Sequence, residues 1–139
     1  MLGARGAVSL VSLFLLLALV AAGYAGFLYI PLYLDNLSMR EAVTAAFNRM
    51  AADPDDERIR LYLVSRANAI GTHWERQGAV QAEKPGLGLT PADFIIERES
   101  FTGHSGRVQL DYQREFRLWP TDTLKTVDFH VEKAGTLAQ

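Results

Sequence analysis

The feature that most constrains this chain is a stretch of twenty-nine residues, from Gly6 to Leu34, without a charged side chain. Arg5 precedes the stretch and Asp35 follows it. An α-helix rises about 1.5 Å per residue and a bilayer core is about 30 Å thick, so about twenty apolar residues cross a membrane. We therefore expect residues 1–34 to be an N-terminal membrane anchor with one transmembrane helix, and residues 35–139 to form a separate domain.

The charges that flank this stretch predict its orientation. Arg5 and the amino terminus form the basic flank, and basic flanks stay in the cytoplasm. We expect a single-pass protein of the inner (cytoplasmic) membrane, with a cytoplasmic N-terminus and a periplasmic C-terminal domain. A cleaved signal peptide is the alternative, with an apolar region over 8–20 and small residues at 20–22. The apolar run continues as far as Tyr33, which favours a retained anchor, and either reading exports the domain.

Composition limits the chemistry that the domain can carry. All sixteen acidic residues, but only thirteen of the fourteen basic ones, lie at Asp35 or later. A weakly acidic domain is not expected to bind nucleic acid. The chain has no cysteine, which excludes disulfides, thiolate metal sites and cysteine nucleophiles.

Two helices are expected after the span. Ser38 and Glu41 have the spacing of a capping box, and apolar residues at helical spacing follow as far as Met50. Alternatively, this helix extends the membrane helix, with residues 31–36 as a kink. For the second helix, Asp53 is the expected N-cap with Pro54 in the first turn, and the helix is expected to end near residue 71.

The remainder of the chain changes to a period of two. Residues 73–82 fit either a helical turn or an edge strand, and 81–91 are expected to be a loop. Residues 94–100, 107–118 and 124–132 alternate as strands do. We expect an α+β fold: one N-terminal transmembrane helix, then a small domain of two helices and a three-stranded antiparallel meander. The second helix is expected to cover one face of the sheet.

Polar residues in this domain do not form a recognisable catalytic motif. His73, His104 and His130 lack the spacing of metal ligands, so surface or cross-strand hydrogen bonds are the expected roles. Acidic pairs along the strands have basic residues nearby, which favours solvated salt bridges. We expect no catalytic residues, no metal site and no cofactor, and we expect that the protein is not an enzyme.

Four residues are predicted to bind partners. Trp119 follows the longest strand, and exposed tryptophans are enriched at interfaces, although it could simply cover the sheet edge. Ala18, Ala22 and Gly26 are spaced by four and form one stripe of the membrane helix. Small-residue stripes let transmembrane helices pack closely, although such residues are also common in any span. The expected partners are membrane lipid and a transmembrane helix of a partner protein or of a second copy.

The order of these features resembles a family of uncharacterised Gram-negative single-span membrane proteins with a domain of unknown function. The resemblance comes from the basic start, the apolar span ending at residues 29–34, and the strand pattern around residues 108–112. The layout is also similar to type IV pilins and pseudopilins, which have a long N-terminal helix before an antiparallel sheet. If Gly6 and Ala7 are aligned with the prepilin cleavage point, Val11 stands where those proteins carry a glutamate.

The sequence therefore predicts a single-span anchored accessory or structural subunit of an envelope membrane protein complex, without catalytic activity. One alternative is a pilin-like or pseudopilin-like assembly component. The other is an extracytoplasmic ligand-binding or enzymatic domain.

Overall fold

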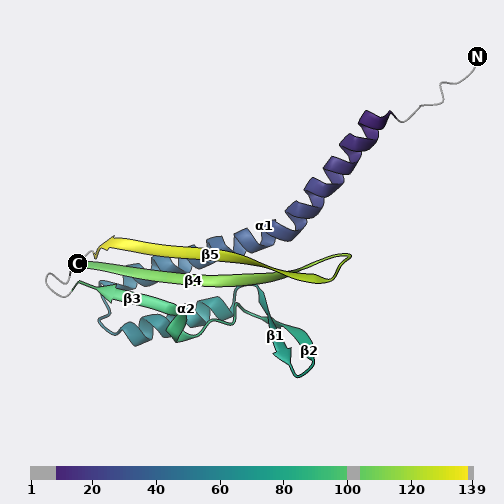
Figure 1. Ribbon diagram of the computed structural model, residues 1–139. Coiled ribbons are helices and arrows are strands. Elements are labelled where there is room, and N and C mark those ends of the chain that lie inside the picture. Colours follow the sequence, from purple (N-terminus) through teal and green to yellow (C-terminus); the bar gives the residue numbers. More distant parts are fainter. Residues whose placement is uncertain (1–8, 100–103, 138–139) are drawn as a thin grey trace, which may run out of the picture. The chain divides into compact units, whose positions relative to one another are not determined.

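The computed structural model describes residues 9–99 and 104–137 and has an α+β fold, as predicted (Figure 1). The chain divides into two compact units, with the boundary between Pro31 and Leu32. The elements are α1 (Leu10–Met50), α2 (Asp56–Asn68), β1 (Thr72–Gln77), β2 (Val80–Pro85), the 3-10 helix η1 (Pro91–Asp93), β3 (Phe94–Arg98), β4 (Ser105–Leu118) and β5 (Thr123–Thr136).

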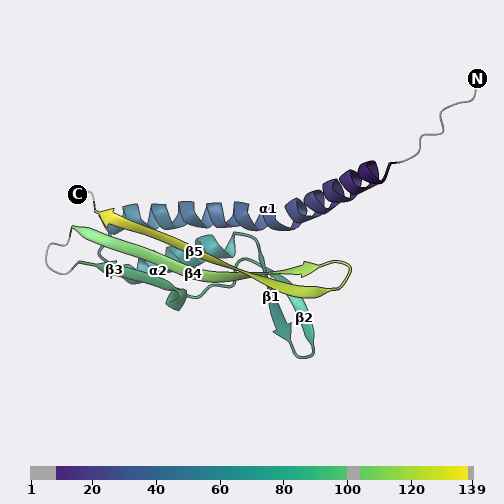
Figure 2. The same ribbon diagram turned by 45° about the horizontal axis from the view of Figure 1, so that its top comes forward.

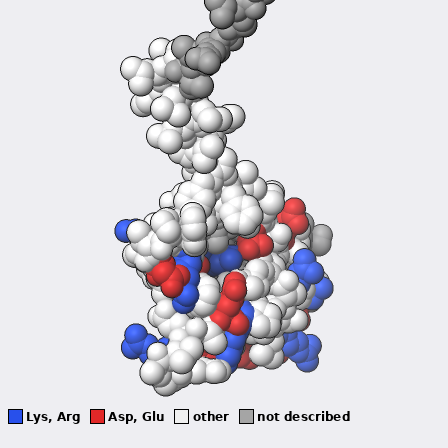
Figure 3. Space-filling model, turned by 90° about the vertical axis from the view of Figure 1, so that its right-hand side faces the viewer, with Lys and Arg blue, Asp and Glu red and all other residues white. Residues whose placement is uncertain are grey.

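The part of α1 in the first unit is apolar and exposed. An 18-residue window of the helix has a mean hydropathy of 2.3, and none of that window is buried. By length and composition, α1 can cross a membrane, which is compatible with a membrane anchor or a signal sequence. Figure 3 shows no coloured charged side chain on the described part of this apolar segment.

The helix does not begin anew at Ser38, so the predicted capping box is wrong and the alternative of an extended helix is correct. α1 continues without interruption to Met50, and the Ser38 hydroxyl donates a hydrogen bond to the Leu34 carbonyl (3.3 Å). The physical reason is the buried stripe of the helix, which starts at Leu32 and continues through Asn36 and Met39. Because this face packs before and after Ser38, the serine has no free helix end to cap.

The second helix starts two residues later than predicted. Asp55, not Asp53, is the N-cap, and its side chain accepts from the backbone N–H groups of Glu57 and Arg58. Asp53 instead accepts from the backbone N–H of Asp55 (2.9 Å), which makes a turn before the cap. The helix buries Ile59, Leu63 and Ala67, which are spaced by four and lie on one face.

The three-stranded antiparallel meander is confirmed in the order β3-β4-β5. Alternate residues of β4 are buried, and the register places Leu110 opposite Val131 and Tyr112 opposite Phe129. β5 extends further than predicted, to Thr136. The C-terminal part of α1 and α2 both lie along the buried face, so the second helix does not cover it alone (Figures 1 and 2). The opposite face of the sheet is exposed.

The segment after α2 forms a separate two-stranded hairpin, β1-β2. Residues 81–85 belong to β2, so the loop predicted from Gln81 is wrong over that range. Gly78 has a φ of 63° and provides the left-handed conformation that a two-residue hairpin turn favours. Of the two alternatives for residues 73–82, the strand is correct for β1. Its pairing with β2 was not predicted, because both strands are mostly polar and exposed and lack the alternation of a half-buried strand.

Candidate functional site

The exposed face of the meander carries a network of paired charges. Arg107 of β4 pairs with Glu97 of β3 (3.6 Å) and with Glu132 of β5 (3.2 Å). Glu132 also lies 3.4 Å from the Nε2 atom of His130, whose Nδ1 contacts Asp111. Because alternate residues of paired strands share one face, these side chains from three strands meet on the solvent side of the sheet.

The neighbouring carboxylates change the pKa of His130. The register places His130 directly opposite Asp111, which confirms the predicted cross-strand hydrogen bond. The hydrogen bond to Asp111, followed by that to Glu132, raises the pKa of His130 above its ordinary value of 6.5. The same bond to His130 lowers the pKa of Asp111. Both groups are solvated, so this arrangement favours an exposed ion pair rather than a proton-transfer site.

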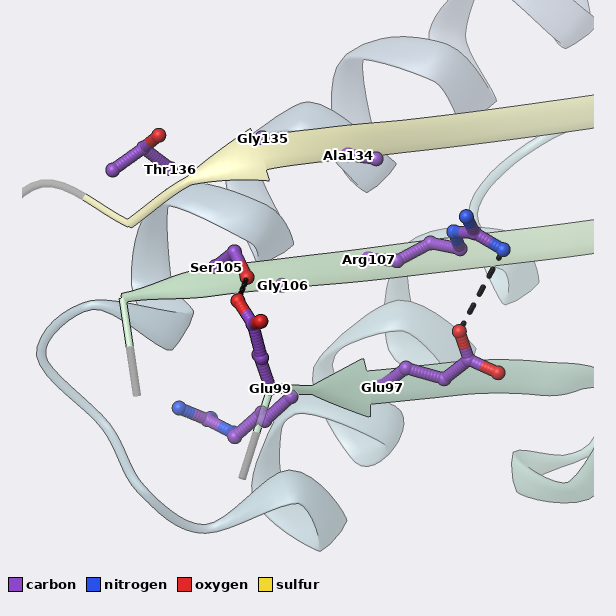
Figure 4. Close-up of a pocket in the computed structure, with 9 residues that line it drawn as sticks. Glu97, Glu99, Ser105, Gly106, Arg107, Ala134, Gly135 and Thr136 are labelled. Carbon is purple, nitrogen blue, oxygen red and sulfur yellow. Dashed lines mark hydrogen bonds and ion pairs between the residues drawn. The ribbon is translucent and has the colours of Figure 1, made fainter. Parts of the chain in front are cut away.

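One depression lies at the end of the sheet where β3 ends and β4 begins (Figure 4). It has a volume of about 670 Å³, and small residues of β5, including Ala134 and Gly135, line one side. The hydroxyl of Ser105 donates to the carboxylate of Glu99, and Arg107 faces Glu97. Two pairs of polar side chains in this depression are thus already bound to each other, which makes it a charged surface feature of the sheet end.

The buried face contains an ion pair that the sequence analysis did not predict. Nη1 of Arg114 lies 3.0 Å from Oδ2 of Asp35, and the Arg114 side chain is only 6% exposed. Gly71, at a φ of 57°, packs against this pair, and an added Cβ would lie 2.6 Å from Asp35 Oδ2 and 2.9 Å from Arg114 Nη1. Position 71 therefore requires glycine both for its left-handed backbone and for this close approach.

A second buried polar contact lies beside the ion pair. The hydroxyl of Tyr112 donates a 2.9 Å hydrogen bond to Oδ1 of Asn36. Burial raises the pKa of Tyr112 to about 12, against a smaller opposing effect of Arg114. The phenol therefore stays protonated and keeps donating throughout the physiological pH range. Together with Asp35 and Arg114, this contact joins α1 to β4.

Trp119, the partner-binding residue predicted in the domain, is 79% exposed just beyond β4. Nearby, Arg117 pairs with Asp122 (3.3 Å) and its guanidinium lies over the ring of Trp74 in β1 (4.5 Å). Arg117 also borders a cleft whose other lining residues belong to the β1-β2 hairpin, among them Val80. The structure thus places Arg117 of β4 beside the β1-β2 hairpin, a proximity that no local sequence pattern indicated.

The predicted stripe of Ala18, Ala22 and Gly26 lies in the apolar part of α1. The two alanines are exposed, and Gly26 is half-buried. A Cβ at Gly26 would make ordinary contact with Ile30 Cδ1 at 3.5 Å, so the helix tolerates a larger residue there. Docking of another helix on this stripe remains a prediction.

The other two histidines have local structural contacts. Nδ1 of His73 lies 2.7 Å from the carbonyl oxygen of Gly86, at the end of β2. The carbonyl of His104 accepts from the backbone N–H of Leu137. Among residues 9–99 and 104–137, histidine and acidic side chains do not gather in a group that could hold a metal ion.

Comparisons with protein-family models, with curated proteins and with solved structures found no significant match to this chain.

Proposed function

We propose that this protein is a single-span membrane-anchored subunit, with an accessory or structural role in an envelope membrane protein complex. The observation that carries this proposal is the exposed apolar surface of α1, where large side chains such as Leu10, Phe14 and Leu19 face outward. Each buried side chain of this size gains about 1.5–3 kcal/mol when it leaves water. A lipid bilayer supplies that burial along the apolar part of the helix.

Retention of the anchor is supported by apolar residues that follow the possible signal-peptide cleavage site. After a cut at residues 20–22, Phe27, Ile30 and Leu34 would remain exposed on the released domain. These side chains are large, and Phe27 is 78% exposed. A membrane explains their exposure better than an aqueous compartment does, because leaving large apolar side chains in water is unfavourable. We propose an inner-membrane location with a cytoplasmic N-terminus and a periplasmic domain.

The second unit favours a structural role over catalysis. Its buried polar side chains join elements to one another: Arg114 binds Asp35, and Tyr112 binds Asn36. On its exposed face, Arg107 pairs across strands with Glu97 and Glu132. A domain built in this way offers a rigid surface to a partner, and Ala18, Ala22, Gly26 and Trp119 are the proposed contact residues.

Membrane extraction and affinity purification test this proposal. The full-length protein should remain in membranes after alkaline carbonate washing, and its intact mass should include the apolar segment. Leu16→Lys combined with Leu17→Lys should release it, because each charge at the centre of a span costs about 2.5–3.5 kcal/mol. Leu16→Ile combined with Leu17→Ile is the matched control. Recovery of the unaltered protein in the carbonate supernatant would refute the anchor.

The partner face is tested separately. Ala22→Ile combined with Gly26→Ile adds apolar bulk, so the protein should stay in the membrane while its co-purifying proteins are lost. Leu13→Ile combined with Val20→Ile, on the opposite side of the helix, should leave them bound. Unchanged co-purification of the stripe variant would refute docking on this face.

A pilin-like assembly component is the second candidate, and one observation favours it. α1 is a single helix that is apolar in its first part and packed against an antiparallel sheet in its second part. The corresponding cleavage point, Gly6 and Ala7, lies outside the described residues. Mass spectrometry of the membrane protein decides between the candidates, because a pilin-like protein would begin at residue 7. A chain that retains residues 1–6 would favour the anchored subunit.

A further inference from the structure

The outer edge of β5 carries a row of backbone groups that face away from the sheet, because β5 is the last strand in the order β3-β4-β5. The N–H of Leu137 donates to the carbonyl of His104, the residue opposite it when the β4-β5 register is continued by one position. Bonded and non-bonded pairs alternate along an antiparallel ladder, so odd-numbered residues of β5 bond to β4. The even-numbered residues therefore point their N–H and C=O groups outward. The bond from the N–H of Glu99 to the carbonyl of Ser105 agrees, because odd residues of β4 then bond to β3 and even ones to β5.

This edge is less protected than the opposite edge of the sheet. β3 has only five residues, and its Phe94 carbonyl accepts from Nε of Arg60 in α2 (3.4 Å). β5 has fourteen residues, with no proline and no break in its register with β4. Among the described residues, no backbone hydrogen bond from a turn, a loop or another element reaches positions 124–134. Inward-facing charges blunt such edges, but Lys125 and Lys133 do so only at the two ends of this one, which leaves 126–132 accessible to another strand.

A groove of about 530 Å³ lies beside this edge. Arg40 and Thr44 of α1 line it together with His130, Glu132 and Ala134 of β5, among others. These three β5 residues are even-numbered and exposed, so their outward backbone groups border the groove. The groove thus gives access to the groups to which an added strand would bond.

We propose that the β5 edge, defined as residues 126–134, binds an extended segment of a partner protein as a fourth strand of the sheet. This inference rests on the proposed role as a subunit of a membrane protein complex, and it assigns one contact within that complex. The main-chain hydrogen bonds of the added strand provide the binding. Asp128 and Glu132 are exposed on the solvent side of β5, so basic side chains at alternate positions of the segment would face them.

The position of α1 favours a separate segment over the β5 strand of a second copy. α1 lies against the inward side of β5, where a Cβ at Gly135 would be 3.8 Å from Cζ of Phe47 (Figures 1 and 2). Arg40 and Thr44 border the groove, so the helix is not set back from the edge. Paired strands lie about 4.8 Å apart, whereas packed helices need about 8–10 Å between their axes. Pairing two β5 strands would therefore make their α1 helices collide, and a segment without a helix behind it avoids this.

Hydrogen exchange along β5 tests this inference. The full-length protein is compared alone in detergent and in the complex purified from its membranes, by mass spectrometry with single-residue fragmentation. Alone, the amides of His130 and Glu132 should exchange freely, while those of Phe129 and Val131, which bond to β4, should be protected. In the complex, exchange at His130 and Glu132 should slow by about tenfold or more, because both N–H groups are then hydrogen-bonded.

A proline substitution tests the same contact by mutation. Ala134→Pro removes one outward N–H and leaves the bonds to β4, because proline is tolerated where the N–H of an edge strand faces solvent. Ala134→Val is the matched control, since it adds similar bulk and keeps the N–H. The proline variant should retain at least about threefold less partner than the valine variant, with an unchanged circular dichroism spectrum. If the proline variant misfolds, the exchange comparison decides alone.

The outcomes separate this inference from the proposed function. A full-length protein that purifies from membranes without any partner would refute the accessory role, and this contact with it. A complex in which His130 and Glu132 exchange as freely as in the isolated protein would overturn only the strand addition. So would a folded Ala134→Pro variant that retains as much partner as Ala134→Val. Protection of these amides when a second copy is the sole binding partner would also overturn it.

Discussion

Individual polar residues connect parts of the second unit that are distant in sequence. Asp35 and Arg114 are 79 positions apart, and Asn36 and Tyr112 are 76 positions apart. An arginine on the inward side of a strand must find an acid, because an unpaired buried charge is costly. The sequence shows Arg114 interrupting an apolar row, so a buried partner could have been expected. Which acid it binds depends on how α1 and β4 meet, and local patterns do not encode that.

The pair of His130 and Asp111 gives the first prediction at this scale. Raising the pKa of His130 means that its contribution to stability is present below pH 6.5 and is lost as pH rises through the raised pKa. Because the pKa of Asp111 is lowered in the folded state, its contribution to stability is present above pH 3.8. That contribution is lost as pH falls through the lowered pKa. The ion pair therefore stabilises the folded state most between pH 3.8 and pH 6.5.

Replacing Asp111 with Asn should lower the pKa of His130 towards 6.5, because the main cause of its elevation is removed. The remaining contact with Glu132 should keep part of the elevation. Proton NMR titration of the imidazole resonances measures this change, and His73, which contacts Gly86 instead, is the internal reference. An unchanged pKa of His130 in this variant would contradict the assigned ion pair.

At the scale of elements, Arg98 joins both helices to the sheet. From the end of β3, its guanidinium donates to the carbonyls of Met50 (2.8 Å) and Asp53 (2.7 Å) and to the carboxylate of Asp56 (2.7 Å). The carbonyl of Met50 is at the C-terminus of α1, where intrahelical donors are missing. The connection between α1 and α2 is thereby fastened to the edge strand.

Element type was easier to predict from the sequence than element connection. The meander and α2 were predicted because apolar residues recur at periods of two and 3.6, and burial enforces those periods. The hairpin β1-β2 was missed because its polar strands are set by their turn and their pairing, not by a buried face. The continuation of α1 through Ser38 was only an alternative, because a capping signal in the sequence does not show whether the preceding turn is helical.

Arg98→Met should destabilise the second unit by about 1–3 kcal/mol, because it removes charge-assisted hydrogen bonds and leaves the end of α1 without these donors. Arg98→Lys should lie between this variant and the unaltered protein, since an ammonium cannot reach three acceptors in the guanidinium geometry. Urea denaturation of the full-length protein in detergent, followed by circular dichroism, measures the change. Arg58→Met is the control, because Arg58 is mostly exposed. Equal midpoints for the Arg98 and Arg58 variants would refute this role.

At the scale of the whole molecule, the two parts of α1 have different surroundings. Up to Pro31, α1 exposes apolar side chains, and from Leu32 onward it supplies core residues such as Met39, Val43 and Met50. The sequence indicated part of this change, because the stretch without charged side chains that starts at Gly6 ends at Asp35. The partner-binding face was harder to predict from the sequence, because small residues and exposed aromatic residues also occur where they bind no partner.

The proposed orientation of the molecule gives the last prediction. Arg5 is the only charged side chain before the apolar segment, and every acidic residue follows it. Translocating the basic flank is disfavoured, so residues 35–139 should lie outside the cytoplasm. A phosphatase reporter fused after Gln139, active only outside the cytoplasm, should be active, whereas a galactosidase reporter at the same position should be inactive. Arg5→Glu should weaken this bias, because the basic flank is removed, and Arg5→Lys should preserve it. The reverse pattern of reporter activity in the unaltered chain would show that its domain is cytoplasmic, and the envelope role proposed for that domain would then be wrong.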